Sequence, residues 1–170
     1  MRYLFISLLI FIGFSGNINA QRQRRMNPEK PFVHDPVVAC ENGIYYMFCT
    51  GMGVDVLVSK DGMKTWEPGK SPVDPIPQWA MDLVPAYKGH TWASDIQKVG
   101  DTWYLYYSCS TFGKNISVIG LTTNKTLDPS SPDYKWEDQG MVVRSIPEVN
   151  DWNAIDPNLI IDDEGNPWLN

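Results

Sequence analysis

The chain has 170 residues, of which 43% are hydrophobic and 12% aromatic, and its formal net charge is −6 at pH 7. This length suits one domain with a buried core. The acidic balance argues against a nucleic acid or an anionic membrane as partner, because either would attract a basic face. An acidic chain rich in Trp and Tyr instead favours a neutral ligand, and sugars are the obvious class.

Residues 1–20 have the pattern of a secretory signal peptide. Arg2 supplies a basic start, an apolar run Y-L-F-I-S-L-L-I-F-I-G-F follows, and the segment ends at Ala20. The apolar run is shorter than the roughly 20 residues that span a membrane, so an N-terminal anchor is the weaker alternative. We expect cleavage after Ala20, although Ile18 fits poorly at the −3 position, and then a flexible leader over 21–30. The protein is therefore expected to be secreted or periplasmic, with no membrane contact after cleavage.

From residue 31 onward the sequence is typical of an all-β protein. Short runs rich in Tyr, Val, Ile and Trp are bounded by Gly, Asp, Asn and Pro. Residues 68–90, interrupted by several prolines, are expected to form a long irregular connection, and no segment after the signal peptide has a helical period long enough for a helix. Strands are predicted at 36–40, 44–50, 54–59, 64–67, 92–99, 102–109, 115–122, 135–143 and 157–162.

An aspartate followed by a short apolar run, a turn and an aromatic strand recurs at a nearly constant spacing. Asp35 and Asp95 are 60 positions apart, and Asp95 and Asp156 are 61 positions apart. This period predicts a structural repeat of about four strands, with the three acids at equivalent positions. Four antiparallel strands per repeat are typical of a β-propeller blade. A lone Asp before a strand is more often a turn residue, but three acids that converge on a common funnel predict a ligand pocket.

The segment S-K-D-G-M-K-T-W over 59–66 resembles an Asp-box turn, a structural motif of propeller outer hairpins. Asp61 and Thr65 are expected to satisfy turn amides while Trp66 packs between sheets. Trp136 is expected to pack in the same way in the following unit.

The three cysteines, Cys40, Cys49 and Cys109, are expected to be buried, reduced thiols. Asn42-Gly43 predicts a tight hairpin, and its register keeps Cys40 away from Cys49, so a bridge between them would need a different register. Neither histidine of the chain forms a recognisable Cys/His motif, which argues against a catalytic thiol.

Three blocks of the sequence resemble the signature blocks of glycoside hydrolase family 43, in the family's order. Within the family they are most similar to arabinan endo-1,5-α-L-arabinosidases, and the resemblance covers about residues 31–170. It implies a five-bladed β-propeller, of which this chain would hold about two blades and the start of a third. It also implies an inverting mechanism acting on arabinan or a related plant cell-wall polysaccharide. The blocks are His34-Asp35-Pro36, Trp92-Ala93-Ser94-Asp95-Ile96 and Asn153-Ala154-Ile155-Asp156-Pro157-Asn158.

The resemblance also implies roles for individual residues. Asp35 corresponds to the general base that deprotonates the attacking water, and Asp156 to the carboxylate that orients the acid and tunes its pKa. Asp95 has no proton-transfer role in the family and is expected to be structural. For Trp92, core packing is an open alternative to sugar stacking, and for His34 strand capping is an open alternative to lining the pocket. Substrate contacts are implied for His34, Trp92, Gly113, Asn153, Ala154 and Ile155.

The family's general acid is a glutamate on a later strand, which the resemblance places beyond residue 170. The glutamates present, among them Glu41 in a predicted turn, match no such motif. The chain is therefore expected to be the N-terminal portion of a longer, monomeric hydrolase and to be inactive alone. No cofactor is expected to be required and no metal ligand is predicted here, although the resemblance allows a structural ion at the centre of the full-length propeller. The alternatives are another family activity (β-xylosidase or exo-α-L-arabinofuranosidase) or a non-catalytic glycan-binding propeller.

Overall fold

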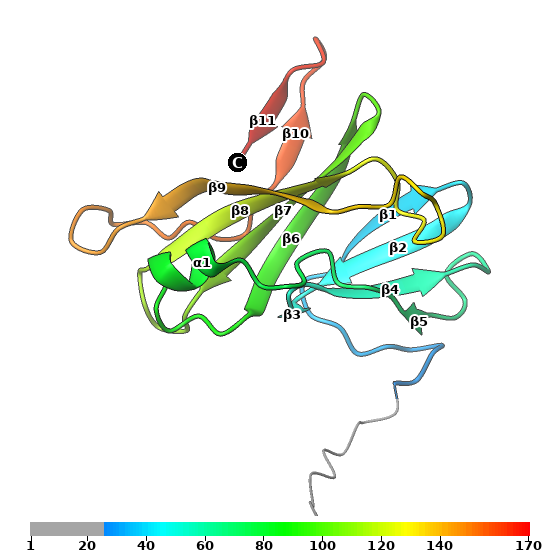
Figure 1. Cartoon of the computed structure of the whole chain (residues 1–170), viewed down its shortest axis with the longest axis horizontal. Helices are drawn as coiled ribbons and strands as arrows, with labels where there is room; N and C mark the ends of the chain where they lie inside the picture. The colour runs from blue at the N-terminus through cyan, green and yellow to red at the C-terminus, as the bar shows by residue number, and fades with distance from the viewer. Residues whose placement is uncertain (1–25) are drawn as a thin grey trace, which may run out of the picture.

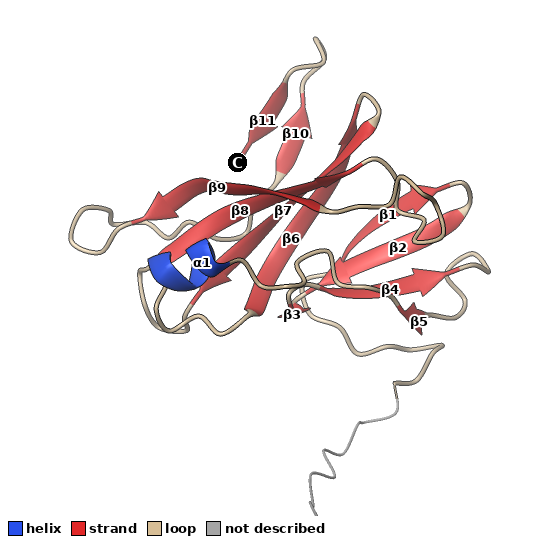
Figure 2. Ribbon diagram, in the orientation of Figure 1, coloured by secondary structure: helices blue, strands red, loops and turns tan. Residues whose placement is uncertain are grey.

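The computed structural model describes residues 26–170, so the expected signal peptide lies outside the described residues. Within this range the chain is all-β apart from one short helix (Figures 1 and 2). No helix of the described residues is long and apolar enough to cross a membrane. The elements are β1 (Val37–Glu41), β2 (Ile44–Cys49), β3 (Gly51–Met52), β4 (Asp55–Ser59), β5 (Glu67–Pro68), α1 (Gln78–Leu83), β6 (His90–Val99), β7 (Thr102–Ser110), β8 (Ser117–Asn124), β9 (Glu137–Ser145), β10 (Leu159–Ile161) and β11 (Pro167–Leu169).

Two four-stranded antiparallel meanders follow one another along the chain, as the repeat predicts, and β3 adds a fifth strand to the second. The first sheet has the strand order β1-β2-β4-β5, and the second has the order β3-β6-β7-β8-β9. The β10–β11 hairpin follows as a separate two-stranded sheet, drawn in red tones in Figure 1. β3 is the exception to the simple repeat, because it continues β2 after Thr50 but pairs with His90 and Thr91 of β6. A single stretch of chain thus contributes a strand to each of the first two sheets.

The predicted hairpin between β1 and β2 is confirmed. Asn42 (φ 52°) and Gly43 (φ 79°) both occupy the left-handed region, which a two-residue type I′ turn requires. Cys40 lies opposite Tyr45, far along the hairpin from Cys49, and all three cysteines of the chain are free. The expected burial is correct for the other two thiols but wrong for Cys40, which is exposed because it alternates with buried Ala39 on an edge strand.

The predicted Asp-box forms the turn between β4 and β5, and it delays the start of β5 to Glu67. The Thr65 hydroxyl and N–H, with the Ser59 hydroxyl, donate to Asp61 and hold the pKa of its carboxyl at about 2. Trp66 is buried, and its main-chain N–H donates to the Pro28 carbonyl at 2.9 Å. The part of the expected flexible leader that the structure describes is therefore tied to this turn.

Asp95 does not occupy the position that the repeat predicts. Asp35 and Asp156 precede strands and have φ of 50° and 55°, whereas Asp95 lies inside β6. The three acids are therefore not geometrically equivalent, because β6 begins at His90, where it pairs with β3, and so extends beyond Asp95 on its N-terminal side. Its carboxylate accepts hydrogen bonds from the Leu159 N–H at 2.6 Å and the Asn158 amide at 3.2 Å. Asp95 thus joins the second sheet to the β10–β11 hairpin.

The core fills the space between the first sheet, the second sheet and the connection that contains α1. The Trp136 ring meets Phe48 edge to face at 6.2 Å between centroids, so the β8–β9 connection packs on the first sheet as expected. The prediction of no helix is wrong: α1 buries Ala80, and Val84 follows it in the core. With six residues, α1 is too short to show a helical period, and the indole N–H of Trp79 fastens it to Asp138 at 2.8 Å.

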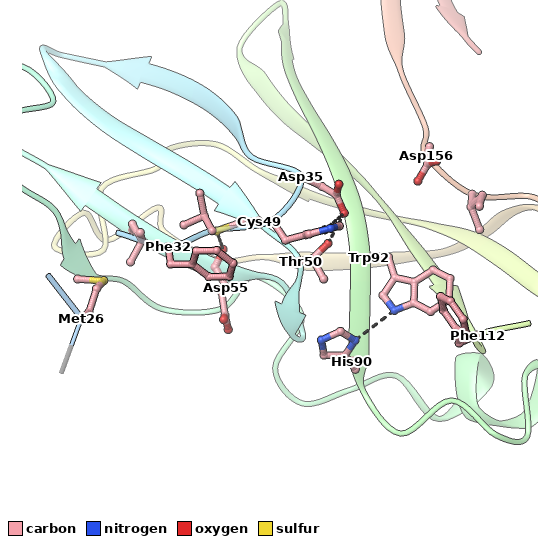
Figure 3. A pocket seen from close by; sticks show the side chains of 14 residues that line it. Met26, Phe32, Asp35, Cys49, Thr50, Asp55, His90, Trp92, Phe112 and Asp156 are labelled. Atoms are coloured by element: carbon pink, nitrogen blue, oxygen red, sulfur yellow. Dashed lines mark hydrogen bonds and ion pairs between the residues drawn. The ribbon is translucent and has the colours of Figure 1, made fainter. Parts of the chain in front are cut away.

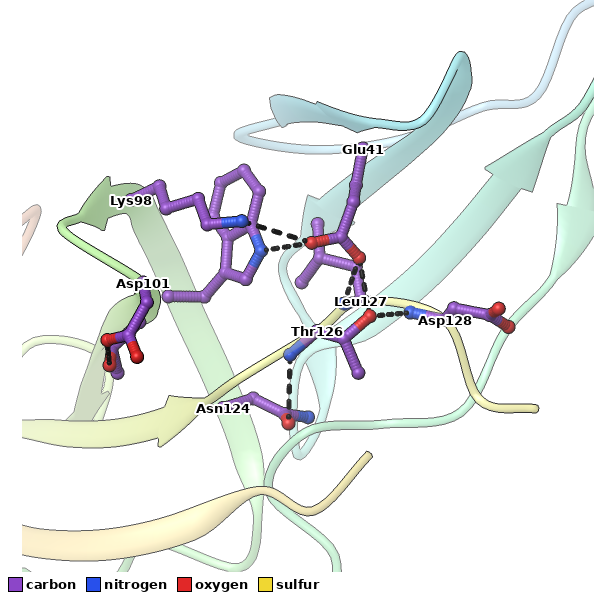
Figure 4. A network of polar contacts seen from close by, with 9 residues as sticks. Glu41, Lys98, Asp101, Asn124, Thr126, Leu127 and Asp128 are labelled. Atoms are coloured by element: carbon purple, nitrogen blue, oxygen red, sulfur yellow. Dashed lines mark hydrogen bonds and ion pairs between the residues drawn. The ribbon is translucent and has the colours of Figure 1, made fainter. Parts of the chain in front are cut away.

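Glu41, at the end of β1, locks the first unit to the second (Figure 4). One carboxylate oxygen accepts from the Trp103 indole at 2.9 Å and from Lys98 at 3.4 Å, and the other accepts from the Thr126 hydroxyl at 2.6 Å and the Leu127 N–H at 2.7 Å. Burial alone would raise the pKa of Glu41, but these four donors outweigh it and hold the pKa below its ordinary value. The position that the sequence assigned to a turn is therefore a polar clamp between units.

We expect Glu41→Gln to lower the free energy of unfolding by about 2 kcal/mol at pH 7, because the glutamine amide turns N–H groups toward donors. The folded-state pKa of Glu41 is depressed, so its contribution is present above the unfolded value of 4.5 and is lost as pH falls through the folded value. Denaturant unfolding of wild type and variant at neutral pH and near pH 4 measures both effects.

The control for this prediction is Glu137→Gln. Glu137 pairs with Lys135 at 2.8 Å on an exposed surface, so its loss should change stability by less than about 0.5 kcal/mol. Equal losses in the two variants would contradict the role given to Glu41.

Candidate active site

A pocket of about 900 Å³ opens where the segment before β1, the start of β6 and the segment before β10 meet (Figure 3). Exposed Phe32 and Phe112 stand among its walls, at 96% and 93% exposure. Five of the predicted site residues line this pocket although they are up to 122 positions apart in the sequence: His34, Asp35, Trp92, Ile155 and Asp156.

The remaining predicted contacts, Gly113, Asn153 and Ala154, do not line the pocket. Asn153 turns its side-chain oxygen toward the hydroxyls of Ser117, at 2.6 Å, and Ser145, at 3.4 Å, which anchors the loop to β8 and β9. Ala154 is buried. Gly113 has φ 71° and open space where a Cβ would stand, next to Phe112. Substrate contacts by these three residues stay predictions.

Asp35 is held on one carboxylate oxygen. Its Oδ2 lies 2.6 Å from Nδ1 of His34 and accepts the Thr50 hydroxyl at 2.8 Å. The Thr50 N–H donates in turn to the His34 carbonyl at 3.0 Å, which fixes the turn where Asp35 adopts its left-handed conformation. Among residues 26–170 nothing donates to Oδ1, so this oxygen is free to take a proton.

Asp156 is held by its backbone. Its N–H donates to the Ser108 hydroxyl at 3.0 Å, and Ser108 is fully buried on β7. Asp156 also has a left-handed φ, 55°, and its carboxylate lies on the pocket side (Figure 3). The two predicted acids thus reach one pocket from segments on either side of β6.

A β-bulge in β6 connects these supports. The register with β7 shifts between Trp92 and Ser94, so Ala93 is skipped in the pairing of these two described strands. Its N–H donates instead to the Thr50 hydroxyl at 3.1 Å, and its carbonyl accepts from the Ser108 hydroxyl at 3.3 Å. The freed main-chain groups of one residue therefore bind the two hydroxyls that hold the acids.

Trp92 faces the pocket beside His90, which supports the sugar-stacking alternative over complete burial in the core. The Trp92 indole N–H donates to Nδ1 of His90 at 3.1 Å, a contact drawn in Figure 3. An indole N–H can only donate, so this contact requires His90 Nδ1 to be unprotonated. His90 thereby sets the direction of the Trp92 ring.

Cys49 is not suited to act as a nucleophile. Cys49 lines the pocket, but burial, with a smaller contribution from Asp55, raises the pKa of its thiol to about 11, and the group stays protonated. Within residues 26–170 no three His, Cys, Asp or Glu side chains gather closely enough to hold a metal ion. The structural ion that the resemblance allows stays a prediction.

Sequence reasoning missed Thr50, Ser108, His90 and Phe112. Hydroxyl residues are common on strands, and neither Thr50 nor Ser108 belongs to a signature block, so no local signal distinguishes them. His90 stands two residues before the second block, and that proximity was the one available signal. Phe112 adjoins Gly113, which was predicted.

Two carboxylates that face one pocket on a β-repeat fold are the arrangement of a glycoside hydrolase. The family model for glycosyl hydrolases family 43 matches residues 27–170, and the chain belongs to this family. An extracellular exo-α-(1→5)-L-arabinofuranosidase of Cellvibrio japonicus (strain Ueda107) is 48% identical over 137 residues, which are 81% of this chain and 39% of that protein. An extracellular endo-α-(1→5)-L-arabinanase of Bacillus subtilis (strain 168) is 40% identical over 141 residues, 81% of this chain and 42% of that protein.

Solved structures give the same picture. An exo-1,5-α-L-arabinanase from a bovine ruminal metagenomic library superimposes with a TM-score of 0.82 at 61% identity, over 85% of this chain and 47% of that one. The α-L-arabinanase of Cellvibrio cellulosa in complex with arabinohexaose gives 0.77 at 47% identity, over 81% and 43%. The chain thus spans about two fifths of the length of the curated relatives that it matches.

We expect His90→Ala to shift the indole N–H resonance of Trp92 at constant pH, because the variant removes the imidazole nitrogen that accepts the indole hydrogen bond at 3.1 Å. Proton–nitrogen correlation spectra, with Trp92→Phe to assign the resonance, measure this. His34→Ala, which keeps the acceptor, should leave the resonance unchanged. A Trp92 resonance that is the same in wild type and in His90→Ala would rule out the contact.

Proposed function

We propose that the protein containing this chain hydrolyses α-1,5-linked L-arabinofuranosyl bonds in arabinan by an inverting acid/base mechanism. The observation that carries the proposal is the placement of Asp35 and Asp156, from two signature blocks 121 positions apart, on one pocket. The family membership supports it, as do relatives named for arabinan cleavage and a similar structure solved with arabinohexaose.

Asp35 acts as the general base in this proposal. Thr50 and His34 occupy Oδ2, which leaves Oδ1 to accept the proton of a water that attacks the anomeric carbon. An inverting hydrolase needs this water between its base and the sugar, on the face opposite to the leaving group. The exposed carboxylate of Asp35 meets this need, because a buried one would exclude the water.

Asp156 acts on a partner in this proposal. A carboxylate close to the general acid disfavours a second negative charge and so keeps the acid protonated until it donates to the leaving oxygen. We assign that acid to a glutamate in the region of the protein outside this chain. We further propose that the described sheets are the first blades of a five-bladed propeller.

Exo-action is the second candidate, because the relatives with 61% and 48% identity are named as exo-acting and the one with 40% as endo-acting. The exposed rings of Phe32 and Phe112 offer sugar-stacking surfaces at the pocket in either mode. We also propose that the protein is exported, because the segment before Ala20 has the signal-peptide pattern and both curated relatives are named extracellular.

Asp35→Asn and Asp156→Asn should each lower kcat on linear arabinan at least about 100-fold in the whole protein, because each removes a carboxylate from the acid/base set. Asparagine tolerates left-handed backbone, so the fold should remain. Reducing-sugar release and thermal unfolding measure the two properties. Asp163→Asn, in the exposed β10–β11 turn, is the matched control, and wild-type turnover by a folded Asp35→Asn variant would sink the assignment.

The size of the early products separates the two modes of action. Endo-cleavage of linear arabinan should give a mixture of oligosaccharides with a rapid fall in viscosity, whereas exo-cleavage should give one short product with little early change in viscosity. Chromatography of the products at low conversion is the measurement. Absence of any cleavage, with retained binding of arabinan, would favour the glycan-binding alternative.

A further inference from the structure

We propose that Thr50 and Ser108 are positioning residues for the two acids, and that the bulged residue Ala93 joins their hydrogen bonds into one network. The inference rests on the proposed function, because it assigns roles to groups that hydrogen-bond to Asp35 and Asp156. It uses hydrogen bonds between residues of β6 and β7 and the end of β2, which are distant in the sequence.

The direction of the Thr50 hydrogen bonds is determined by its neighbours. A main-chain N–H can only donate, so the Ala93 N–H, at 3.1 Å, makes Thr50 Oγ1 an acceptor. The single hydroxyl proton of Thr50 is then directed to Asp35 Oδ2 at 2.8 Å. An ionised carboxylate only accepts, so the geometry suits the charged, base-competent form of Asp35.

The same reasoning fixes the direction at Ser108. The Asp156 N–H donates to its hydroxyl oxygen at 3.0 Å, so the Ser108 proton points to the Ala93 carbonyl at 3.3 Å. Ser108 is 0% exposed, and water does not compete for these contacts. One set of hydrogen bonds runs from the Asp156 N–H through Ser108 to the Ala93 carbonyl, and the other runs from the Ala93 N–H through Thr50 to the Asp35 carboxylate. The two sets belong to different peptide groups and meet at the Cα of Ala93, which joins them into one network.

The network is needed to hold both acids, because each has a backbone conformation that most residues avoid. Asp35 and Asp156 have φ of 50° and 55°, a region that persists where the surroundings over-determine it. Without the Ser108 hydroxyl the Asp156 N–H loses its partner and the loop relaxes. Without the Thr50 hydroxyl the Asp35 carboxylate can rotate on its exposed side. In either case the carboxylate is present but incorrectly oriented, and displacement of a catalytic group by about 1 Å can lower the rate about 100-fold.

Steady-state kinetics of the whole protein on linear arabinan test the proposal. Thr50→Val and Ser108→Ala should each lower kcat by about 10- to 100-fold while KM stays within about twofold, because orientation and not substrate affinity is lost. Thr50→Ser keeps the hydroxyl and should restore kcat to within about threefold of wild type. Ser110→Ala is the control. Ser110 is also buried on β7, but its hydroxyl donates to the Ile116 carbonyl, at 3.2 Å, which lies outside the network that joins the acids.

The double variant Thr50→Val with Ser108→Ala tests the link through Ala93. If the hydrogen-bond network acts as a unit, kcat of the double variant should be little lower than kcat of the less active single variant. If the fold-losses in kcat of the two single variants multiply in the double variant, the link through Ala93 is overturned. Unchanged kcat in Thr50→Val and Ser108→Ala, or equal kcat loss in Ser110→Ala, would overturn the positioning roles. Thr50→Val is nearly isosteric at a half-buried site, so it keeps the test decisive even if Ser108→Ala fails to fold. Full activity of Asp35→Asn would instead overturn the proposed function.

Discussion

The bulge at Ala93 is the constraint on which the candidate site depends. In a regular ladder the N–H and carbonyl of this residue would pair with β7, and no main-chain group would be left for the neighbours. The register shift frees both groups, and they meet the hydroxyl of Thr50, between β2 and β3, and the hydroxyl of Ser108 on β7. Three pieces of backbone that carry Asp35, Trp92 and Asp156 are thereby tied to one another at a single residue.

The hydrogen bonds of Glu41 fix the first sheet to the second unit at a second position. Asp35 lies just before β1 and Glu41 ends it, so the two clamps hold opposite ends of the same strand. Glu41 binds the second unit through Trp103, Thr126 and the Leu127 N–H, and the Phe48–Trp136 contact packs between the clamps. An active site needs this kind of rigid support, because its carboxylates must be held close to the productive geometry before substrate binds.

The sequence predicted most strands, the hairpin turn, the Asp-box and five residues of the pocket. These depend on local rules, such as left-handed turn residues at Asn42-Gly43, or on motifs that extend over adjacent residues. It failed for α1, because six residues are too few to show a helical period. It also failed where pairing between strands decides: Cys40 is exposed on an edge strand, and Asp95 lies inside β6 because β6 extends to pair with β3. Thr50, Ser108 and Glu41 act through partners 15 to 86 positions away, and no pattern in one sequence records such partners.

The crossover of β3 bears on how such a protein can be rearranged. By sequence β3 belongs to the first repeat, but by pairing it is the edge strand of the second sheet. A module cut at the sequence repeat would leave β6 with an open edge, which invites aggregation. Because β3 lies in sequence between β2 and β4, a break before β3 would also remove β4 and β5 from the first sheet, and a break after β5 would leave β6 without β3. No single break therefore leaves both sheets complete, and the two sheets can be transferred intact only together.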